Sequence, residues 1–133
     1  MVVGLTTTVR EIMSTALVTV DPTANLTETA RVMFAERAGS VLVLDDGSLV
    51  GIFTERDILR ALGDSSSADL ARVSAVSKWM SKDPETIDPE TTVAEALNRM
   101  LFGGFRHLPV MDGEAVVGMV SMRDLARSMA HPS

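Results

Sequence analysis

Residues 51–62 read GIFTERDILRAL, and residues 118–129 read GMVSMRDLARSM. In each stretch an apolar segment that starts with glycine leads to a hydroxyl residue, and an aspartate follows three positions later. The apolar segment is typical of a strand, and the residues after the hydroxyl are typical of a helix. The same strand-to-helix corner at two places, 67 residues apart, predicts that the chain contains one unit twice.

The duplication extends well beyond these two corners. At the same offset, residues 11–62 align with residues 78–129 without a gap, and 14 of the 52 pairs are identical. The sequence TVDP at residues 19–22, for example, meets TIDP at residues 86–89. Because only two copies occur, the chain is a duplicated domain rather than a solenoid.

The boundaries of the repeats follow from this alignment. We place the first repeat at residues 8–63, a polar linker at residues 64–76 and the second repeat at residues 77–130. Residues 68–73 of the linker are predicted to form one helical turn. Short helical lead-ins are predicted at VREIM, residues 9–13, and at VSKWM, residues 76–80.

Each repeat is predicted to have the element order β-α-β-β-α. Runs of apolar residues indicate the strands, Asp-Pro and Asp-Gly sequences indicate the turns, and apolar residues three or four apart indicate the helices. In the first predicted helix, the apolar residues on one face are Leu26, Ala30, Met33 and Phe34. The predicted strands and helices are 17–20, 26–37, 40–44, 49–54 and 55–62 in the first repeat, and 85–88, 93–102, 107–111, 116–121 and 122–129 in the second.

A single repeat of about 50 residues buries too little surface to be stable by itself. Apolar residues make up 46% of the 133-residue chain, and nine methionines can fill gaps in a core with few aromatic side chains. We therefore predict an α+β fold in which the two β-α-β-β-α repeats pack sheet to sheet with approximate twofold symmetry. Junctions of this kind often hold ligands, so we expect a binding cleft between the repeats.

The composition argues against several classes of function. A formal charge of −6 without a basic run argues against binding to nucleic acids or anionic membranes. No apolar run approaches the ~20 residues of a membrane span, and the N-terminus does not resemble a signal peptide. The chain has no cysteine, which excludes disulfides and cysteine-ligated metals, and a cytoplasmic location is expected. Its two histidines, His107 and His131, do not indicate a metal site.

The two corners have a purely structural interpretation. A Thr or Ser where a strand becomes a helix accepts a hydrogen bond from a backbone N–H of the first turn. An acidic residue three positions later can reach back to the N–H of the cap, which completes a capping box. Thr54 with Asp57, and Ser121 with Asp124, fit this pattern. Capping alone could explain the repeated motif without any ligand.

Taken together, these features resemble a tandem pair of CBS domains (cystathionine-β-synthase-type domains), also called a Bateman module. The resemblance is carried by the repeated β-α-β-β-α unit, the TVDP entry, the LPVMD strand with its turn, and the glycine–apolar–apolar–[Thr/Ser]-x-x-Asp exit. It covers about residues 8–130. It implies a regulatory module, commonly a flat homodimer, that binds AMP, ADP, ATP, NAD or S-adenosylmethionine.

The resemblance also implies which residues contact the ligand. Asp57 and Asp124 of the repeated motif are expected to accept hydrogen bonds from ribose hydroxyls. Thr54 and Ser121 are expected to lie beside ribose or phosphate. The remaining expected contacts come from the first strand of each repeat and from the entry to its second strand, namely Thr19, Ser40, Val41, Thr86, Arg106, His107, Leu108 and Pro109.

The two ligand positions are not predicted to be equivalent. A phosphate at a helix N-terminus that already holds an aspartate needs an additional donor or cation. In the second repeat Arg106 and His107 are candidates, and the direction of their side chains decides which of them serves. The matching pair in the first repeat is Gly39 and Ser40, which offers no cation. We expect one position to bind an anionic nucleotide well and the other weakly or not at all.

Other basic and aromatic residues have alternative interpretations. Arg56 and Arg123 belong to a solvated helix face, or they contact phosphate or form a salt bridge in a dimer. Arg60 and Arg127, one turn later, are predicted to be cations near the helix C-termini. Trp79 is predicted to lie in the core or at an interface.

Three classes of function remain open from the sequence. The first is a ligand-sensing module that requires no cofactor, takes an adenine nucleotide as its regulatory ligand and signals to an effector protein that the sequence does not identify. The second is a structural or dimerisation module without a functional ligand. The third is an enzyme, which the sequence does not favour because Ser121 lacks a histidine–acid partnership.

Overall fold

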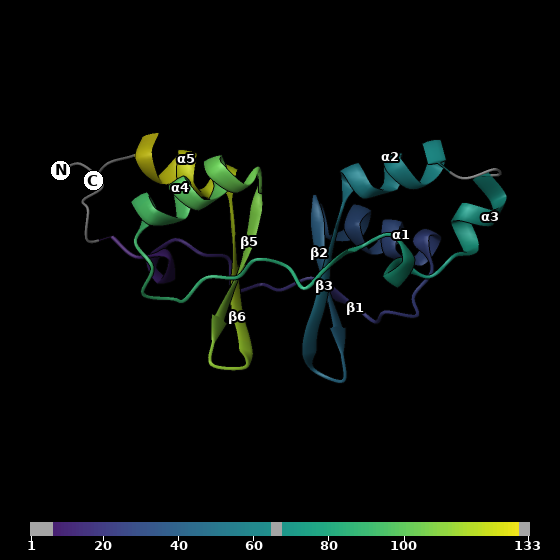
Figure 1. Cartoon of the computed structure of the whole chain (residues 1–133), viewed down its shortest axis with the longest axis horizontal. Helices are drawn as coiled ribbons and strands as arrows, with labels where there is room; N and C mark the ends of the chain where they lie inside the picture. Colours follow the sequence, from purple (N-terminus) through teal and green to yellow (C-terminus); the bar gives the residue numbers. More distant parts are fainter. Residues whose placement is uncertain (1–6, 65–67, 131–133) are drawn as a thin grey trace. The chain divides into compact units, whose positions relative to one another are not determined.

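The structure is a computed structural model that describes residues 7–64 and 68–130. It confirms a mixed α+β fold with two sheets (Figure 1). The first repeat contains β1 (Thr19–Val20), α1 (Leu26–Glu36), β2 (Ser40–Asp45), β3 (Ser48–Thr54) and α2 (Glu55–Asp64). The second contains α4 (Val93–Gly103), β5 (His107–Asp112), β6 (Ala115–Ser121) and α5 (Met122–Ala130). The remaining elements are the 3-10 turns η1 (Val9–Glu11) and η2 (Val76–Lys78), the short helix α3 (Ala68–Val73) and β4 (Ser81–Lys82).

The order β-α-β-β-α is complete in the first repeat and abbreviated in the second. There the strand predicted at residues 85–88 is reduced to one parallel bridge between Ile87 and Val110. The Ile87 N–H donates to the Pro109 carbonyl at 3.0 Å, and the Ile87 carbonyl accepts from the Met111 N–H at 2.9 Å. Two hydrogen bonds hold this segment in place without extending it into a strand.

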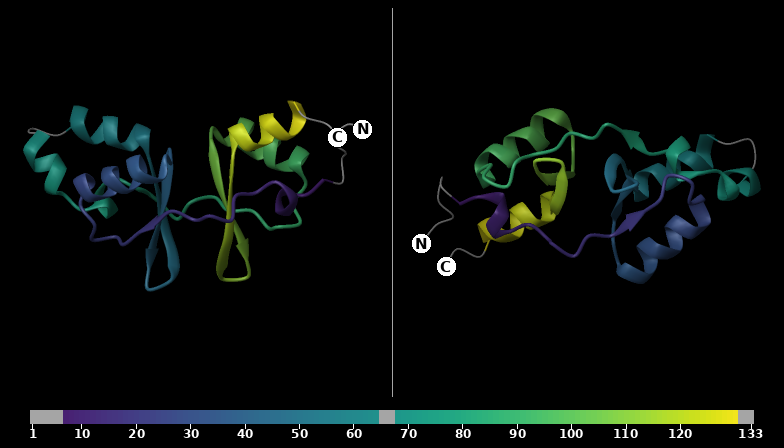
Figure 2. Two further views of the ribbon diagram at one scale, coloured as in Figure 1. Left: turned by 180° about the vertical axis from the view of Figure 1, so that it is seen from behind. Right: turned by 90° about the horizontal axis from the view of Figure 1, so that it is seen from below.

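The chain divides into two compact units, and one of them is built from two stretches that are separate in the sequence. One unit is Val18–Pro84, and the other combines the chain before Val18 with the chain from Glu85 onward. The predicted lead-ins η1 and η2 are confirmed, but η1 belongs to the unit of the second repeat. The Val9 N–H donates to the Thr91 carbonyl at 2.8 Å. Figure 2 shows the N-terminal segment, in purple, with the green and yellow elements of that unit.

The second lead-in completes the first repeat in the corresponding way. The Val76 N–H donates to the Ala24 carbonyl at 2.7 Å, and β4 pairs with β3. The β-strand glycines explain the close approach of both lead-ins. A Cβ on Gly51 would collide with the Met80 side chain, and a Cβ on Gly118 would collide with Met13. The equivalent strand glycine of each repeat therefore makes room for a methionine from the lead-in that precedes the other repeat.

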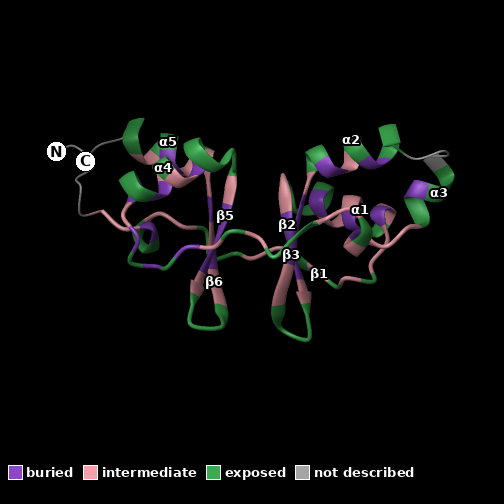
Figure 3. Ribbon diagram, viewed as in Figure 1, coloured by how far each residue is buried: buried purple, intermediate pink, exposed green. Residues whose placement is uncertain are grey.

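Each unit has its own aliphatic core. In the unit of the first repeat, α1 and the β2–β3 hairpin contribute buried side chains, and α3 adds Ala71, which is 1% exposed. The helical turn predicted in the linker is therefore confirmed and packs on the repeat. In the other unit, Val9 of the lead-in is fully buried beside residues of α4, β5, β6 and α5. Figure 3 shows the strands buried along much of their length and the hairpin turns exposed.

The face of α1 that is buried differs from the face we predicted. Leu26, Thr29 and Met33 are buried, whereas Phe34 is 88% exposed. Thr29 can replace an apolar residue there because its hydroxyl donates to the Asn25 carbonyl at 2.9 Å. Since the polar group is satisfied within the helix, its burial carries little penalty. Phe34 is left on the outer surface of the repeat.

Candidate functional site

The corner of the first repeat is built by Thr54, the last residue of β3, and by the first turn of α2. The Thr54 N–H donates to Asp57 Oδ2 at 2.9 Å, and the Thr54 hydroxyl donates to the same oxygen at 3.2 Å. The Asp57 N–H approaches Thr54 Oγ1 at 3.4 Å. These reciprocal bonds form the predicted capping box and orient the carboxylate at the start of the helix.

The corner of the second repeat has the same arrangement at Ser121 and Asp124. The Ser121 N–H donates to Asp124 Oδ2 at 2.9 Å, and the Asp124 N–H donates to Ser121 Oγ at 3.0 Å. The capping interpretation is thus confirmed in both repeats. In each, capping uses only the Oδ2 oxygen of the aspartate, so it leaves Oδ1 for another partner.

The two corners differ in what that other partner is. In the first repeat, Arg60 Nη2 lies 3.3 Å from Asp57 Oδ1 and donates a 2.6 Å hydrogen bond to the Trp79 carbonyl. The Asp57 side chain is only 10% exposed beneath this contact. In the second repeat, the described residues provide no corresponding hydrogen bond or ion pair between Arg127 and Asp124.

Arg60 was predicted to be a C-terminal helix cation, and this prediction is wrong. The helix α2 continues to Asp64, so its last turn holds no basic residue and Arg60 lies in its middle. The prediction is confirmed for Arg127, which lies in the last turn of α5. The role of Arg60 was missed because the Trp79 carbonyl that holds it lies 19 residues away in the chain. No local pattern in the sequence signals that contact.

The entry to the second strand of each repeat lies next to its corner. Ser40 pairs with Thr54 across the β2–β3 hairpin, and His107 pairs with Ser121 across the β5–β6 hairpin. Ser40 and His107 are half-buried. The structure therefore brings several of the predicted ligand contacts together within each repeat.

Three of the predicted ligand contacts can offer a ligand little more than their backbone atoms. Val41 and Leu108 are fully buried in the cores of their repeats, and Pro109 is also buried. Thr19 is exposed on β1, and Thr86 is half-buried just before the Ile87 bridge. Burial of these apolar residues fixes the position of the strand entry beside the corner.

The residues beside the two corners have opposite charges. The Glu55 N–H donates to the Gly39 carbonyl at 3.1 Å, and Glu55 Oε1 lies 3.0 Å from the place that a Cβ on Gly39 would take. In the second repeat the corresponding bond runs from the Met122 N–H to the Arg106 carbonyl, at 2.8 Å. The first repeat thus has the Glu55 carboxylate where the second has Met122. It has Gly39 where the second has the exposed Arg106.

Arg99 is a second residue that the sequence interpretation missed. Its Nη1 donates to the Thr86 carbonyl at 3.3 Å and lies 3.9 Å from Glu85 Oε1. Its Nη2 lies 3.4 Å from Glu95 Oε1, one turn earlier on α4. The spacing of Glu95 and Arg99 signals the helical pair. It does not signal the contact with Thr86.

Trp79 lies at the edge of the first repeat's core, as predicted. It is half-buried and packs against the apolar cluster of that unit. Its indole N–H donates to Ser74 Oγ at 3.1 Å, and the Lys78 ammonium lies 5.6 Å from the ring centroid. These contacts fix the peptide whose carbonyl holds Arg60. His131 falls outside the described residues.

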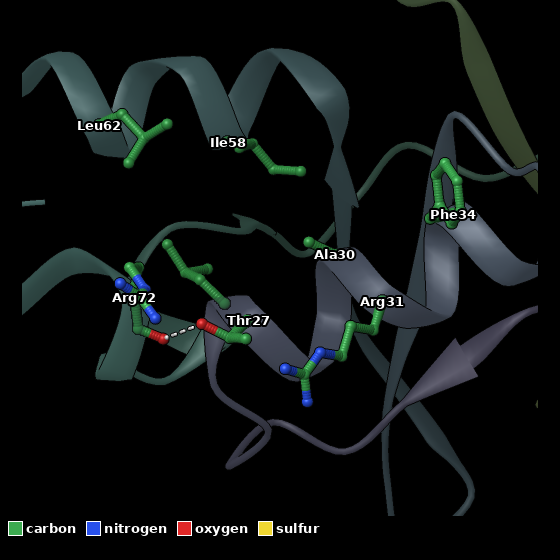
Figure 4. A pocket seen from close by; sticks show the side chains of 8 residues that line it. Thr27, Ala30, Arg31, Phe34, Ile58, Leu62 and Arg72 are labelled. Carbon is green, nitrogen blue, oxygen red and sulfur yellow. Dashed lines mark hydrogen bonds between the residues drawn. The ribbon is translucent and has the colours of Figure 1, made fainter. Parts of the chain in front are cut away.

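An apolar groove of about 380 Å³ lies on the helices of the first repeat. Figure 4 shows Ile58 and Leu62 of α2 pointing toward α1 across it, with Arg31 and Arg72 at its rim. The groove is a surface separate from the Thr54–Asp57 corner. Within residues 7–64 and 68–130, no helix is long and apolar enough to cross a membrane, and no acidic or histidine cluster could hold a metal ion.

Comparisons with known proteins agree on one family. The family model described as CBS domain matches twice, at residues 9–64 and 73–131. An uncharacterized 17.7 kDa protein of Acidianus ambivalens is 39% identical over 127 residues, which is 94% of this chain and 74% of the relative. The CBS-domain containing protein ATU1752 from Agrobacterium tumefaciens is 30% identical, with a TM-score of 0.84 over 92% of this chain and 98% of its own.

Two other similar structures contain adenosine-type ligands. The CBS domain pair of protein MJ0100, in complex with 5′-methylthioadenosine and S-adenosyl-L-methionine, is 25% identical and has a TM-score of 0.82. The match covers 91% of this chain and 94% of that one. The structure of CBSX2 in complex with AMP is 21% identical, with a TM-score of 0.80 over 92% and 95% of the two chains, and shows likeness of fold.

Proposed function

The chain belongs to the CBS domain family, and we propose that it senses an adenine-containing ligand and passes the signal to a partner protein. The ligand class is AMP, ADP, ATP, NAD or S-adenosylmethionine. Two structurally similar proteins hold AMP, or S-adenosylmethionine with methylthioadenosine, which supports this class. The function is binding, and no reaction is assigned to the chain.

One observation carries the proposal. In both repeats the capping box fixes an aspartate by its Oδ2 oxygen, at the N-terminus of a helix and beside the strand entry. A ribose diol presents two neighbouring hydroxyl donors, and an ionised carboxylate is an acceptor that suits them. Since the cap holds the carboxylate in place before the ligand arrives, little conformational freedom is lost on binding.

A thermal-shift panel over the five ligands tests the proposal. At a concentration 100 times its dissociation constant, a ligand that binds only the folded chain stabilises it by about 2.7 kcal/mol. We expect such a rise in melting temperature with at least one ligand, and we expect the Asp124→Asn variant to lose it. A panel in which no ligand raises the melting temperature contradicts the proposal.

We also propose that the chain forms a homodimer through its helices. Both repeats leave large apolar side chains exposed there, and patches of this kind mark protein interfaces. Those side chains are Phe34, Leu59, Leu62, Leu101, Phe102 and Met129. The same observation favours the second candidate function, a dimerisation module without a ligand. A dimer that ignores all five ligands in the thermal-shift panel supports that alternative.

A further inference from the structure

We infer that Arg60 occupies the ribose position of the first repeat, so that the second repeat is the one that takes a phosphorylated adenine ligand. The inference rests on the proposed function and names the site that performs it. It starts from a difference between identical residues. Both Asp57 and Asp124 accept a capping bond through Oδ2, and both have an arginine three positions later, yet only Asp57 is paired with its arginine among the described residues.

The contact of Arg60 gives both oxygens of Asp57 a partner. Oδ2 accepts the N–H and the hydroxyl of Thr54, at 2.9 and 3.2 Å. Oδ1 faces Arg60 Nη2 at 3.3 Å, and the carboxylate is 10% exposed. Because so little of the carboxylate is exposed, a ribose hydroxyl has to compete with the guanidinium for Oδ1. In the second repeat Oδ1 of Asp124 has no such competitor among the described residues.

A second bond keeps Arg60 from moving aside. Its Nη2 donates to the Trp79 carbonyl at 2.6 Å, a short charge-assisted bond. An ion pair of a half-exposed arginine with Asp57 would by itself be weak and screened by solvent. The Trp79 peptide is held by η2 and by the indole bond to Ser74, so the guanidinium has a fixed anchor as well as a charge partner.

The charges around the corners point in the same direction. Glu55 lies over Gly39 in the first repeat, and a phosphate there would meet a carboxylate. The second repeat has Met122 in place of Glu55 and Arg106 in place of Gly39. Like charges repel and opposite charges attract at short range, so a phosphorylated ligand prefers the second corner. Arg60 closes the first corner to ribose, and Glu55 disfavours phosphate there.

Calorimetric titration with AMP measures the number of ligands per chain. We expect the wild type to bind one AMP, at least tenfold more weakly after Asp124→Asn and unchanged after Asp57→Asn. The double variant Glu55→Met with Arg60→Met removes the carboxylate over Gly39 and the guanidinium at Asp57 Oδ1, and it should bind two AMP. Adding Asp57→Asn should return it to one. Methionine favours helix at both position 55 and position 60, so α2 should persist in the double variant.

The matched control is Arg127→Met, which removes the equivalent arginine and should still bind one AMP. If Arg60 had only a structural role, replacing it would not create a binding site. Binding of a second AMP by the double variant therefore tests the inference itself. Two equal sites in the wild type, or a single site in the double variant, overturn it. If the wild type binds no AMP and the double variant binds one, Arg60 and Glu55 do close the first repeat, but the assignment of the ligand to the second repeat fails. If neither binds AMP, the inference fails, and the thermal-shift panel over the other four ligands decides the proposed function separately.

Discussion

Thr54 and Ser121 each end a strand at the point where the next helix leaves backbone N–H groups without partners. The hydroxyl oxygen of each accepts a bond from the aspartate N–H, and the aspartate carboxylate accepts a bond from the N–H of the cap. The motif is therefore structural first, and its binding role depends on the remaining carboxylate oxygen. Sequence spacing alone predicted this geometry because a capping box involves residues only three positions apart.

Removing the Ser121 hydroxyl should destabilise the chain without any ligand present. Ser121→Ala leaves the Asp124 N–H without its partner, so we expect a loss of about 1 kcal/mol in the free energy of unfolding. Urea denaturation measures it. Ser121→Thr keeps the hydroxyl and should be close to the wild type. Equal stability of the alanine and threonine variants would argue against the cap.

Asp21 provides a prediction about pH. The hydroxyl and the N–H of Thr23 donate to Asp21 Oδ1, at 2.6 and 2.9 Å, and these bonds lower the pKa of the carboxyl. A lowered pKa means that this turn adds stability above the ordinary pKa of aspartate and loses it as pH falls through the lowered value. Thr23→Ala should raise the Asp21 pKa in an NMR titration, and Thr23→Ser should not. An unchanged pKa in Thr23→Ala would contradict this assignment.

Arg60 and Arg127 show where prediction from single residues ends. The two are identical, and each lies three positions after the aspartate of its motif. What separates them is a carbonyl of Trp79, 19 residues from Arg60 in the sequence. The charge contrast between Gly39 and Arg106 was visible in the sequence, because those residues differ. The contact of Arg60 was not visible, because it depends on a fold that brings η2 beside α2.

At the scale of elements, the least expected feature is that each lead-in packs on the repeat that it does not precede. The prediction placed residues 9–13 with the first repeat, because they directly precede it. In the structure η1 belongs to the compact unit of the second repeat, and η2 belongs to that of the first. The helical character of both lead-ins was predictable from local sequence. Their destinations depend on where Val9 and Val76 find an apolar core.

Val9→Ala should therefore weaken the repeat that is distant in sequence. Val9 is fully buried in the core of the second repeat's unit, and losing two methyl groups there should cost about 2 kcal/mol. We expect hydrogen exchange to accelerate in β5 and β6 more than in β2 and β3. Val76→Ala is the matched variant and should give the opposite pattern. Faster hydrogen exchange confined to β2 and β3 in Val9→Ala would refute the placement of η1 in the unit of the second repeat.

At the scale of the whole molecule, self-association is the property that can be tested most directly. Phe34 is 88% exposed and Phe102 is 91% exposed. We expect a dimer in sedimentation equilibrium, and we expect Phe34→Glu with Phe102→Glu to shift it toward monomer. Ser48→Glu adds negative charge on an exposed hairpin residue and should leave the dimer intact. A wild-type chain that is monomeric at high concentration contradicts the homodimer.

The sequence by itself determined the duplication, the element order and the two capping boxes, because each depends on residues a few positions apart or on a repeat at constant offset. It also identified the family through that order. Only the tertiary structure decided which lead-in completes which repeat, which face of α1 is buried, and that Arg60 pairs with Asp57. These outcomes depend on contacts such as Val9 with Thr91 and Arg60 with Trp79, which join segments distant in the chain. Such contacts form only when apolar burial has brought the segments together.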